Sequence, residues 1–394
     1  MKQIKHFYLI TITNRYFKPT MIIVHIVEPF VSGIALFIKS LTDSMPDDVH
    51  IIIHGERSEI MKASEVKKNF SKKNTHFIRW RSIGRSINPI RDLLAFSELF
   101  TILGRLKRKN IIDAVHLHSS KAGMLGRMAC RMAGISNVFY TPNGASFLSA
   151  KNGLTKNVYR QLEKIGHRFG GKVVCCSFSE LEEFSKLGIE SIYINNGIEV
   201  NDKFLGKKYS TDKFRIITSG RIETQKNPAL FNSIASYFEE MDQFEFIWIG
   251  EGPDRKMFTA KNINVTGWLN NKEVYQYVAS SDIYVSTSLY EGLSFSGLEA
   301  LAFKKPMLLS NCTGNKDLVK NGINGNLFNT ASDAIVKILQ YYNNRDMLRV
   351  MGNYSKEICQ SEFNAKENFK NYRELYTGSV SKMPINNIRW KFEY

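Results

Sequence analysis

Two glutamates, Glu291 and Glu299, lie eight positions apart in the stretch SLYEGLSFSGLEAL (288–301). An isolated glutamate is most often a solvated surface carboxylate. Here Glu291 follows a predicted strand at 282–286, and Glu299 lies about one turn into a predicted helix. Ligands of open parallel sheets bind beyond the carboxyl ends of the strands, so we expect both carboxylates to face a cleft.

The segment between the glutamates is rich in small residues. We expect its backbone N–H groups to point at a ligand, and the start of the predicted helix to favour an anion there. Glu299 is placed to accept hydrogen bonds from two vicinal hydroxyls, such as those of a ribose. The expected contacts come from four consecutive residues: Gly292, Leu293, Ser294 and Phe295.

Two basic side chains, Arg221 and Lys226, lie five positions apart in the loop TSGRIETQKNP (218–228), which follows another predicted strand. A guanidinium and an ammonium that converge on one point suit a diphosphate, because each can bind separate oxygens. Isolated basic residues are more often solvated, but the position at a strand end favours binding.

Two further strand ends offer weaker signals. IGEGP (249–253) contains Gly250 and Gly252 in the spacing that begins a dinucleotide fingerprint, but the third glycine is absent, so a nicotinamide enzyme is poorly supported. Gly250 stays a candidate binding residue at this turn. In VTGW (265–268), Trp268 follows a short strand and offers a surface for a flat base.

In the first half of the chain, Ser32 and Gly33 open an apolar helix directly after the first strand. Small residues at a helix start can cradle a phosphate, although many such turns contain glycine for steric reasons alone. His116 and His118 are expected to point in different directions, with His118 toward the cleft. We expect no metal at this pair, since no partner carboxylate or cysteine signature accompanies it. Asn143, in the turn TPNG, is a candidate contact or plain turn chemistry.

The elements that must position these residues form two series of β/α units, which is typical of parallel sheets covered by helices. We predict an extension over 1–20, a first domain over 21–200, a linker over 201–212, a second domain over 213–376 and a tail over 377–394. Short β-branched and apolar runs predict strands at 21–27, 50–55, 76–80, 114–118, 137–141, 172–177, 191–197, 214–220, 244–250, 263–267, 282–286 and 306–310.

Composition is that of a soluble protein, with 43% hydrophobic and 23% charged residues among 394. No apolar run reaches the roughly 18 residues that span a bilayer, and the N-terminus lacks the pattern of a signal peptide. The cysteines indicate neither a disulfide framework nor a zinc site, so we expect a cytoplasmic protein. They are Cys130, Cys175, Cys176, Cys312 and Cys359.

The net charge of +17 is uneven. Residues 1–200 carry 29 Lys and Arg against 16 Asp and Glu (+13), and residues 201–394 carry 25 against 21 (+4). Such asymmetry suggests nucleic acid or an anionic membrane as partner. Zinc-finger spacing and an RNA-binding box are absent from the sequence, so we expect no nucleic acid. The segment 80–110 combines an apolar helical face with basic ends, which suits anionic lipid or, alternatively, an ordinary core helix.

The chain resembles the retaining glycosyltransferases of family 4, which have the GT-B fold of two facing Rossmann-like domains. The resemblance rests on SGRIETQKNP, IGEGP, VTGW and above all EGLSFSGLEAL, which matches the family's signature of two glutamates. In the first half, VEPFVSGIALFIKSL, HLHSSKAGMLGR and YTPNGASFL look like members that build bacterial surface polysaccharides.

The resemblance implies transfer of a sugar from a nucleotide diphosphate sugar, UDP- or GDP-linked, to a growing surface glycan, with retention at the anomeric carbon and without a metal or other cofactor. The sequence contains no Asp-x-Asp, which agrees with chemistry that needs no metal. The implied acceptor is a glycan or lipid diphosphate at the inner face of the membrane.

The resemblance also implies residue roles. Arg221 and Lys226 would hold the diphosphate, Glu299 the ribose and Glu291 the hydroxyls of the donor sugar. Gly33 would let its loop approach the phosphates, and His118 would lie beside the donor sugar.

One departure concerns Asn143, where surface-polysaccharide members often have a histidine, so acceptor contacts there are open. Two alternatives remain: a GT-B epimerase or hydrolase that acts without an acceptor, and a non-enzymatic sensor of nucleotide sugars. A sensor would more plausibly have lost Glu291 or Lys226, both of which are present.

Overall fold

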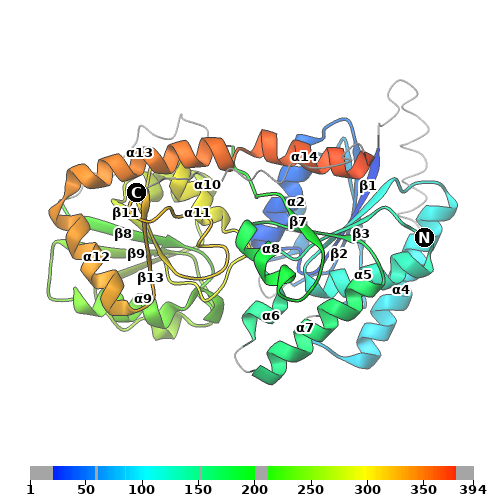
Figure 1. The fold of residues 1–394 in the computed structure, drawn as a ribbon, viewed down its shortest axis with the longest axis horizontal. Coiled ribbons are helices and arrows are strands. Elements are labelled where there is room, and N and C mark those ends of the chain that lie inside the picture. Colours follow the sequence, from blue (N-terminus) through cyan, green and yellow to red (C-terminus); the bar gives the residue numbers. More distant parts are fainter. Residues whose placement is uncertain (1–20, 58–60, 85, 151–152, 200–211, 379–394) are drawn as a thin grey trace.

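The computed structural model describes residues 21–57, 61–84, 86–150, 153–199 and 212–378. These residues form two β/α units side by side, each built on an open sheet of parallel strands (Figure 1). The predicted extension (1–20), most of the predicted linker (201–212) and nearly all of the predicted tail (377–394) lie outside the described residues.

The first sheet has the strand order β3-β2-β1-β4-β5-β6-β7. Its strands are β1 (Ile22–Val27), β2 (Val49–His54), β3 (Thr75–Arg79), β4 (Ala114–His118), β5 (Val138–Thr141), β6 (Lys172–Cys175) and β7 (Ser191–Tyr193). The helices of this part of the chain are α2 (Ser32–Ser44), α3 (Ala63–Lys67), α4 (Pro89–Arg108), α5 (Ser120–Met132), α6 (Ser146–Ser149), α7 (Gly153–Arg168) and α8 (Phe178–Ser185).

The second sheet has the order β10-β9-β8-β11-β12-β13. Its strands are β8 (Phe214–Ser219), β9 (Phe244–Ile249), β10 (Ile263–Gly267), β11 (Ile283–Ser286), β12 (Met307–Ser310) and β13 (Gly325–Phe328). The later helices are η2 (Thr224–Lys226), α9 (Pro228–Tyr237), η3 (Arg255–Met257), α10 (Asn271–Ala279), α11 (Phe295–Ala302), α12 (Ala331–Asn343), α13 (Arg345–Glu362) and α14 (Ala365–Thr377).

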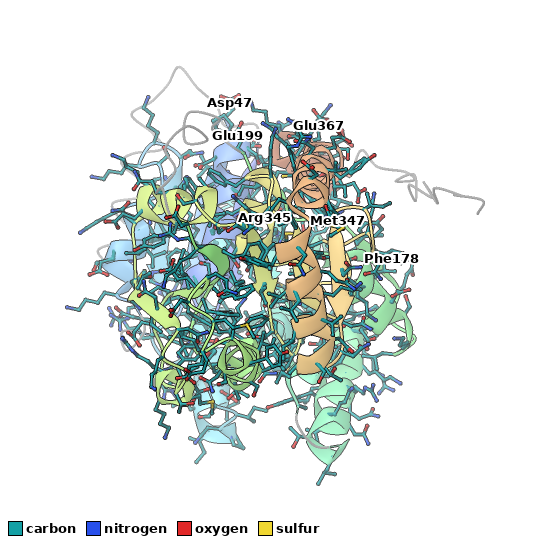
Figure 2. The ribbon with its side chains drawn as sticks, turned by 90° about the vertical axis from the view of Figure 1, so that its left-hand side faces the viewer. Asp47, Phe178, Glu199, Arg345, Met347 and Glu367 are labelled. Atoms are coloured by element: carbon teal, nitrogen blue, oxygen red, sulfur yellow. The ribbon has the colours of Figure 1, made fainter. Side chains whose placement is uncertain are left out.

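Each sheet is buried on both faces, which is why its strands read as apolar runs. Along β1, Ile23 and Val27 pack in the cluster that includes α2, while Val24 and Ile26 pack in the cluster that includes α4 and α5. The alternation follows from the two-residue period of a strand. Viewed along the long axis of the molecule, Arg345 and Met347 mark the start of α13 at the near end of the second unit (Figure 2).

The last helix, α14, packs on the first unit, although the sequence-based boundary placed its residues in the second. It lies against α2, and its side chains Phe369, Tyr372 and Tyr376 belong to the first unit's core. The orange and red helices at the top of Figure 1 trace this return from α13 to α14. The last helix therefore ties the second unit back to the first.

The expected directions of His116 and His118 are wrong. Residues two apart in a strand point to the same face. The two rings lie with their centroids 4.1 Å apart, and both are completely buried.

Candidate active site

A cavity of about 810 Å³ lies between the two units. Its walls come from segments that follow strands of both sheets, as expected for the carboxyl edges of parallel sheets. Of the predicted site residues, these line it: Ser32, Gly33, Asn143, Arg221, Lys226, Trp268, Glu291, Gly292, Leu293, Ser294, Phe295 and Glu299. His118 and Gly250 do not line it.

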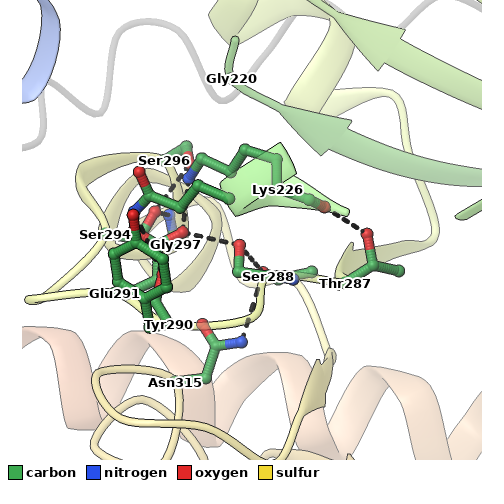
Figure 3. Close-up of polar contacts among 12 residues, drawn as sticks. Gly220, Lys226, Thr287, Ser288, Tyr290, Glu291, Ser294, Ser296, Gly297 and Asn315 are labelled. Atoms are coloured by element: carbon green, nitrogen blue, oxygen red, sulfur yellow. Dashed lines mark hydrogen bonds and ion pairs between the residues drawn. The ribbon is translucent and has the colours of Figure 1, made fainter. Parts of the chain in front are cut away.

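An ion pair between Lys226 and Glu291 lies in this cavity. The Lys226 Nζ is 2.6 Å from Glu291 Oε1, and the side chains are only 19% and 8% exposed. Ser288 Oγ donates to the same carboxylate oxygen at 2.6 Å (Figure 3). Burial alone would lower the pKa of Lys226, but the neighbouring acidic groups, Glu291 foremost, together outweigh it and the pKa of Lys226 is raised. Lys226 therefore carries its charge throughout the physiological pH range.

Lys226 is positioned by the short helix η2 and by a strand-end contact. Its backbone carbonyl accepts a hydrogen bond from Thr287 Oγ1 at 2.7 Å. Gly220, with φ of +148°, leaves room for the lysine stem, because a Cβ there would lie 3.0 Å from Lys226 Cε. Arg221 follows directly, and its Nη1 is 3.2 Å from Glu223 Oε2. The loop thus brings two cations to one wall of the cavity.

Glu299 lies in the second turn of α11. Ser294 caps this helix by accepting a hydrogen bond from the Gly297 N–H at 3.3 Å. Burial raises the pKa of Glu299 to about 7. Its carboxyl group therefore changes charge within the physiological range, unlike an ordinary glutamate.

The two units approach each other closely at Gly292. A Cβ on this residue would lie 2.7 Å from both Cys176 Sγ and the Gly144 backbone nitrogen. A second contact crosses nearby, where Asn196 Nδ2 donates to the Leu293 carbonyl at 3.0 Å. Glycine at 292 therefore permits the two walls to meet.

Trp268 lines the cavity after β10 and is 57% exposed. Gly250 does not line the cavity, and its predicted binding role stays a prediction. Its φ is +139°, and a Cβ there would lie 2.1 Å from the Gly220 carbonyl oxygen. The glycine lets the ends of β8 and β9 approach each other.

On the first unit's wall, Ser32 and Gly33 begin α2 and are exposed to the cavity. A Cβ on Gly33 would lie 3.8 Å from Phe295 Cδ2, so the start of α2 approaches the start of α11 across the cavity. Asn143 has φ of +55°, a left-handed conformation that asparagine tolerates. Its Nδ2 donates to the Thr141 carbonyl at 3.3 Å.

The prediction that His118 faces the cleft is wrong, because this side chain is completely buried. Its Nε2 is 3.1 Å from His25 Nδ1, His25 Nε2 is 3.1 Å from His50 Nδ1, and His50 Nε2 is 3.2 Å from the Met45 carbonyl. Since a carbonyl only accepts, His50 Nε2 must carry its proton, and the same logic fixes the tautomers of His25 and His118. Burial lowers the pKa of all three, so they are neutral.

The neighbouring His116 also belongs to a buried network. Its Nδ1 is 2.6 Å from the Tyr376 hydroxyl and its Nε2 is 2.8 Å from Thr141 Oγ1. Ring nitrogens of His25, His116 and His118 lie within 4.8 Å of one another, a spacing that could hold a metal ion. Hydrogen bonds join these rings into a buried polar network between β1, β4 and α14, in which His118 Nδ1 has no hydrogen-bond partner among the described residues.

The sequence reading missed Arg57, which lines the cavity after β2. Its Nε and Nη2 donate to the two carboxylate oxygens of Glu28 at 2.7 and 2.8 Å. Glu28 is buried and follows β1 directly. Both residues obey the strand-end rule that identified the other site residues, so HIIIHGER (50–57) contained the signal.

Two family models match this chain. The model described as Glycosyltransferase Family 4 matches residues 31–202, and the model described as Glycosyl transferases group 1 matches residues 201–358. Among curated proteins, the chain is 29% identical over 329 residues to an Escherichia coli UDP-Gal:alpha-D-GlcNAc-diphosphoundecaprenol alpha-1,3-galactosyltransferase, covering 75% of this chain and 82% of the relative. It is 27% identical to an Escherichia coli O-antigen biosynthesis glycosyltransferase, covering 70% and 82%.

Solved structures share the fold at low identity. A sucrose-phosphate synthase from Thermosynechococcus elongatus superposes with a TM-score of 0.73 at 14% identity, covering 91% of this chain and 99% of that chain. Anabaena HepE in complex with UDP and glucose superposes with a TM-score of 0.71 at 15% identity, covering 91% and 100%. The expected GT-B fold of two facing Rossmann-like domains is confirmed.

Proposed function

This chain belongs to family 4 of the glycosyltransferases, and from that premise we propose that it moves a sugar from a nucleotide diphosphate sugar to a lipid-linked surface glycan, with retention and without a metal. The observation that carries the proposal is the cavity that joins the Lys226–Glu291 ion pair, Arg221 and Glu299. Its relatives in bacterial polysaccharide synthesis support the substrate class.

For the donor, we propose that Glu299 binds the ribose hydroxyls and that Trp268 lies against the base. Glu291 accepts bonds from the sugar hydroxyls, held in place by Lys226 and Ser288. A UDP-linked donor is favoured over a GDP-linked one, because the Escherichia coli relative is named for UDP-Gal and Anabaena HepE was solved in complex with UDP.

For the chemistry, the bond between the anomeric carbon and the diphosphate oxygen breaks and leaves a second charge on the diphosphate. Positive groups placed for this developing charge stabilise the transition state more than the ground state. Arg221 and Lys226 fill this role. The acceptor oxygen bonds to the anomeric carbon from the side of the leaving group, which retains configuration, and its proton passes to a phosphate oxygen.

For the acceptor, we propose the first unit's wall. Arg57 is held rigidly by Glu28, and its Nη1 lies outside that ion pair. A positioned guanidinium suits the diphosphate of a lipid-linked acceptor. Asn143 is a candidate contact to the acceptor sugar.

The test is a panel of UDP- and GDP-sugars incubated with the purified protein and a short lipid-diphosphate N-acetylglucosamine, in the presence of a chelator. Mass spectrometry of the acceptor reads the result, with Glu299→Ala and Lys226→Ala as inactive variants. Lys320→Ala removes an ion pair to Glu362 outside the cavity and is the matched control.

An acceptor heavier by one sugar, made by the parent and the control but not by the two inactive variants, supports the proposal. Donor consumption without a heavier acceptor would replace it by an epimerase or hydrolase. Donor binding without any turnover would replace it by a sensor.

A further inference from the structure

The start of α8 contacts the second unit. The Ser179 N–H donates to Asp317 Oδ1 at 3.0 Å, and the Ser179 hydroxyl donates to Asp317 Oδ2. The same hydroxyl accepts a hydrogen bond from the Gly314 N–H at 2.7 Å. In Figure 1, α8 lies on the side of the first unit that faces the second. One serine of the first unit therefore holds the segment 312–317 of the second unit at two points.

The segment 312–317 lies directly against Glu291. The Glu291 N–H donates to the Thr313 carbonyl at 2.9 Å. Gly314 has φ of +82°, and a Cβ there would lie 2.6 Å from Glu291 Cβ. Because such close packing transmits displacements, a shift of this segment would move the backbone of Glu291 with it.

Asn315, in the same segment, supports the side chain of Glu291. It is completely buried, and its Nδ2 lies 3.3 Å from Ser286 Oγ and 3.0 Å from Ser310 Oγ. Ser286 Oγ donates to Ser288 Oγ at 3.1 Å, and Ser288 Oγ donates to Glu291 Oε1 at 2.6 Å (Figure 3). A short chain of hydrogen bonds therefore runs from the segment 312–317 to the carboxylate.

The next residue of α8, Glu180, holds the opposite wall of the cavity. Its buried carboxylate accepts hydrogen bonds from the Gly144 N–H at 2.8 Å and from the Cys176 N–H at 3.0 Å. Burial raises the pKa of Glu180, while these donors favour its charged form. Both Cys176 and Asn143, the neighbour of Gly144, line the cavity. The start of α8 therefore connects the first unit's wall to the segment that supports Glu291.

We propose that Asp317 is a positioning residue for Glu291: held by Ser179, it keeps the segment 312–317 where the Glu291 carboxylate can bind the donor sugar. The inference rests on the proposed function for that role of Glu291. Neither Asp317 nor Ser179 lines the cavity, so both act through Glu291 and not on a substrate. A carboxylate that accepts from a backbone N–H and a hydroxyl has a fixed orientation, and such charge-assisted bonds are strong. Loss of the contact should therefore weaken binding of the sugar and leave binding of the nucleotide unchanged.

The test is calorimetric binding of UDP and of the UDP-sugars, without acceptor, to the purified protein and its variants. We expect Asp317→Ala and Ser179→Ala each to weaken binding of the UDP-sugar by about tenfold, with the affinity for UDP unchanged. Asp317→Asn should lose less, because its amide oxygen still accepts from the Ser179 N–H. The matched control is Asp333→Ala, which removes an aspartate of the second unit that accepts hydrogen bonds from the N–H groups of Asn329 and Thr330 outside the cavity.

The Glu291→Gln variant distinguishes positioning from a purely structural role. Adding Asp317→Ala to Glu291→Gln should cause no further loss of affinity for the UDP-sugar, because Asp317 acts through the group that is already changed. A further loss as large as in the parent, an equal loss for UDP and UDP-sugar, or the same loss in Asp333→Ala would overturn the inference. An unchanged affinity for the UDP-sugar in Glu291→Gln itself would also overturn it.

The results for the parent protein separate this inference from the proposed function. If the parent binds a UDP-sugar but transfers nothing, the proposed transfer is rejected, and the affinities of the variants still decide whether Asp317 positions Glu291. If the parent binds neither UDP nor any UDP-sugar, both the proposed function and this inference are rejected.

Discussion

Within the cavity, the Glu291 carboxylate stabilises the positive charge of Lys226, because its Oε1 lies 2.6 Å from Lys226 Nζ. Replacing Lys226 with alanine removes a cation from the point where the leaving group gains charge. We expect Lys226→Ala to lower kcat by roughly 100- to 1,000-fold. Steady-state kinetics measure this, and Lys226→Arg should recover part of the loss. A kcat for Lys226→Ala within a few-fold of the parent would contradict the assignment.

Glu299 predicts a pH dependence of donor binding. With its pKa raised to about 7 by burial, the carboxylate that accepts ribose hydroxyls is lost as the pH falls below 7. We expect affinity for a UDP-sugar to weaken by up to about tenfold per pH unit below 7 and to level off above it. Calorimetry over this range measures the effect. Glu299→Gln should bind more weakly with a flat profile, and a profile as steep as the parent's would assign the titration to another group.

We expect a substitution of Arg57 to weaken binding of the acceptor and to leave binding of the donor unchanged. Lysine keeps the charge but cannot make the two parallel bonds to Glu28, so the cation loses its fixed position. We expect Arg57→Lys to raise KM for a diphosphate acceptor by about tenfold while KM for the donor is unchanged. Kinetics with each substrate varied in turn measure both. An equal rise in both KM values would indicate general damage to the cavity instead.

Most of the site residues predicted from residue type and strand-end position line the cavity, including both glutamates and both cations. Residue type and position did not reveal which strand-end residues pack inward. His118 is buried in a network of histidines, and Gly250 lets the ends of β8 and β9 approach each other. Arg57 was missed, although it follows the end of β2 and obeys the same rule.

At the scale of elements, the loop at 291–292 of the second unit contacts the turn at 143–144 of the first unit. Gly292→Ala would place a Cβ 2.7 Å from Gly144 N and from Cys176 Sγ. We expect it to destabilise the protein by roughly 1–3 kcal/mol, because the added methyl group must push the two walls apart, and to lower transfer, because Gly292 lines the cavity. Thermal unfolding measures the stability.

For Gly104 we expect the opposite, a substitution that stabilises the protein. It lies inside α4, and a Cβ there meets nothing within 4 Å. Gly104→Ala should stabilise the protein by about 0.5–1 kcal/mol, because alanine favours the helix. If Gly104→Ala destabilised the protein as Gly292→Ala does, the close approach at Gly292 would not explain the loss of stability in Gly292→Ala.

The strands were the most predictable elements, because long apolar runs in parallel sheets read clearly. All twelve predicted strands are present, whereas β13 was missed. Its sequence GNLF is short and begins with glycine, and it lies at the edge of the second sheet. The packing of α14 on the first unit could not be read from periodicity, which gives the apolar face of a helix but not its partner.

At the scale of the whole molecule, each of the two units supplies a different set of residues to the cavity. The second unit supplies Arg221, Lys226, Glu291 and Glu299 to the cavity, and the first unit supplies Arg57 and Asn143. The first half of the chain also carries most of the positive charge. The proposed function therefore places the donor on the second unit and an anionic acceptor on the first.

The most direct test of this account is the mass and anomeric configuration of the product formed from UDP-galactose and a lipid-diphosphate N-acetylglucosamine in the presence of a chelator. If UDP-galactose proves inert, the productive donor of the panel takes its place. The account predicts an acceptor heavier by one sugar, joined with the same anomeric configuration as in the donor. A product with inverted configuration, or product formation that requires an added divalent cation, would contradict it.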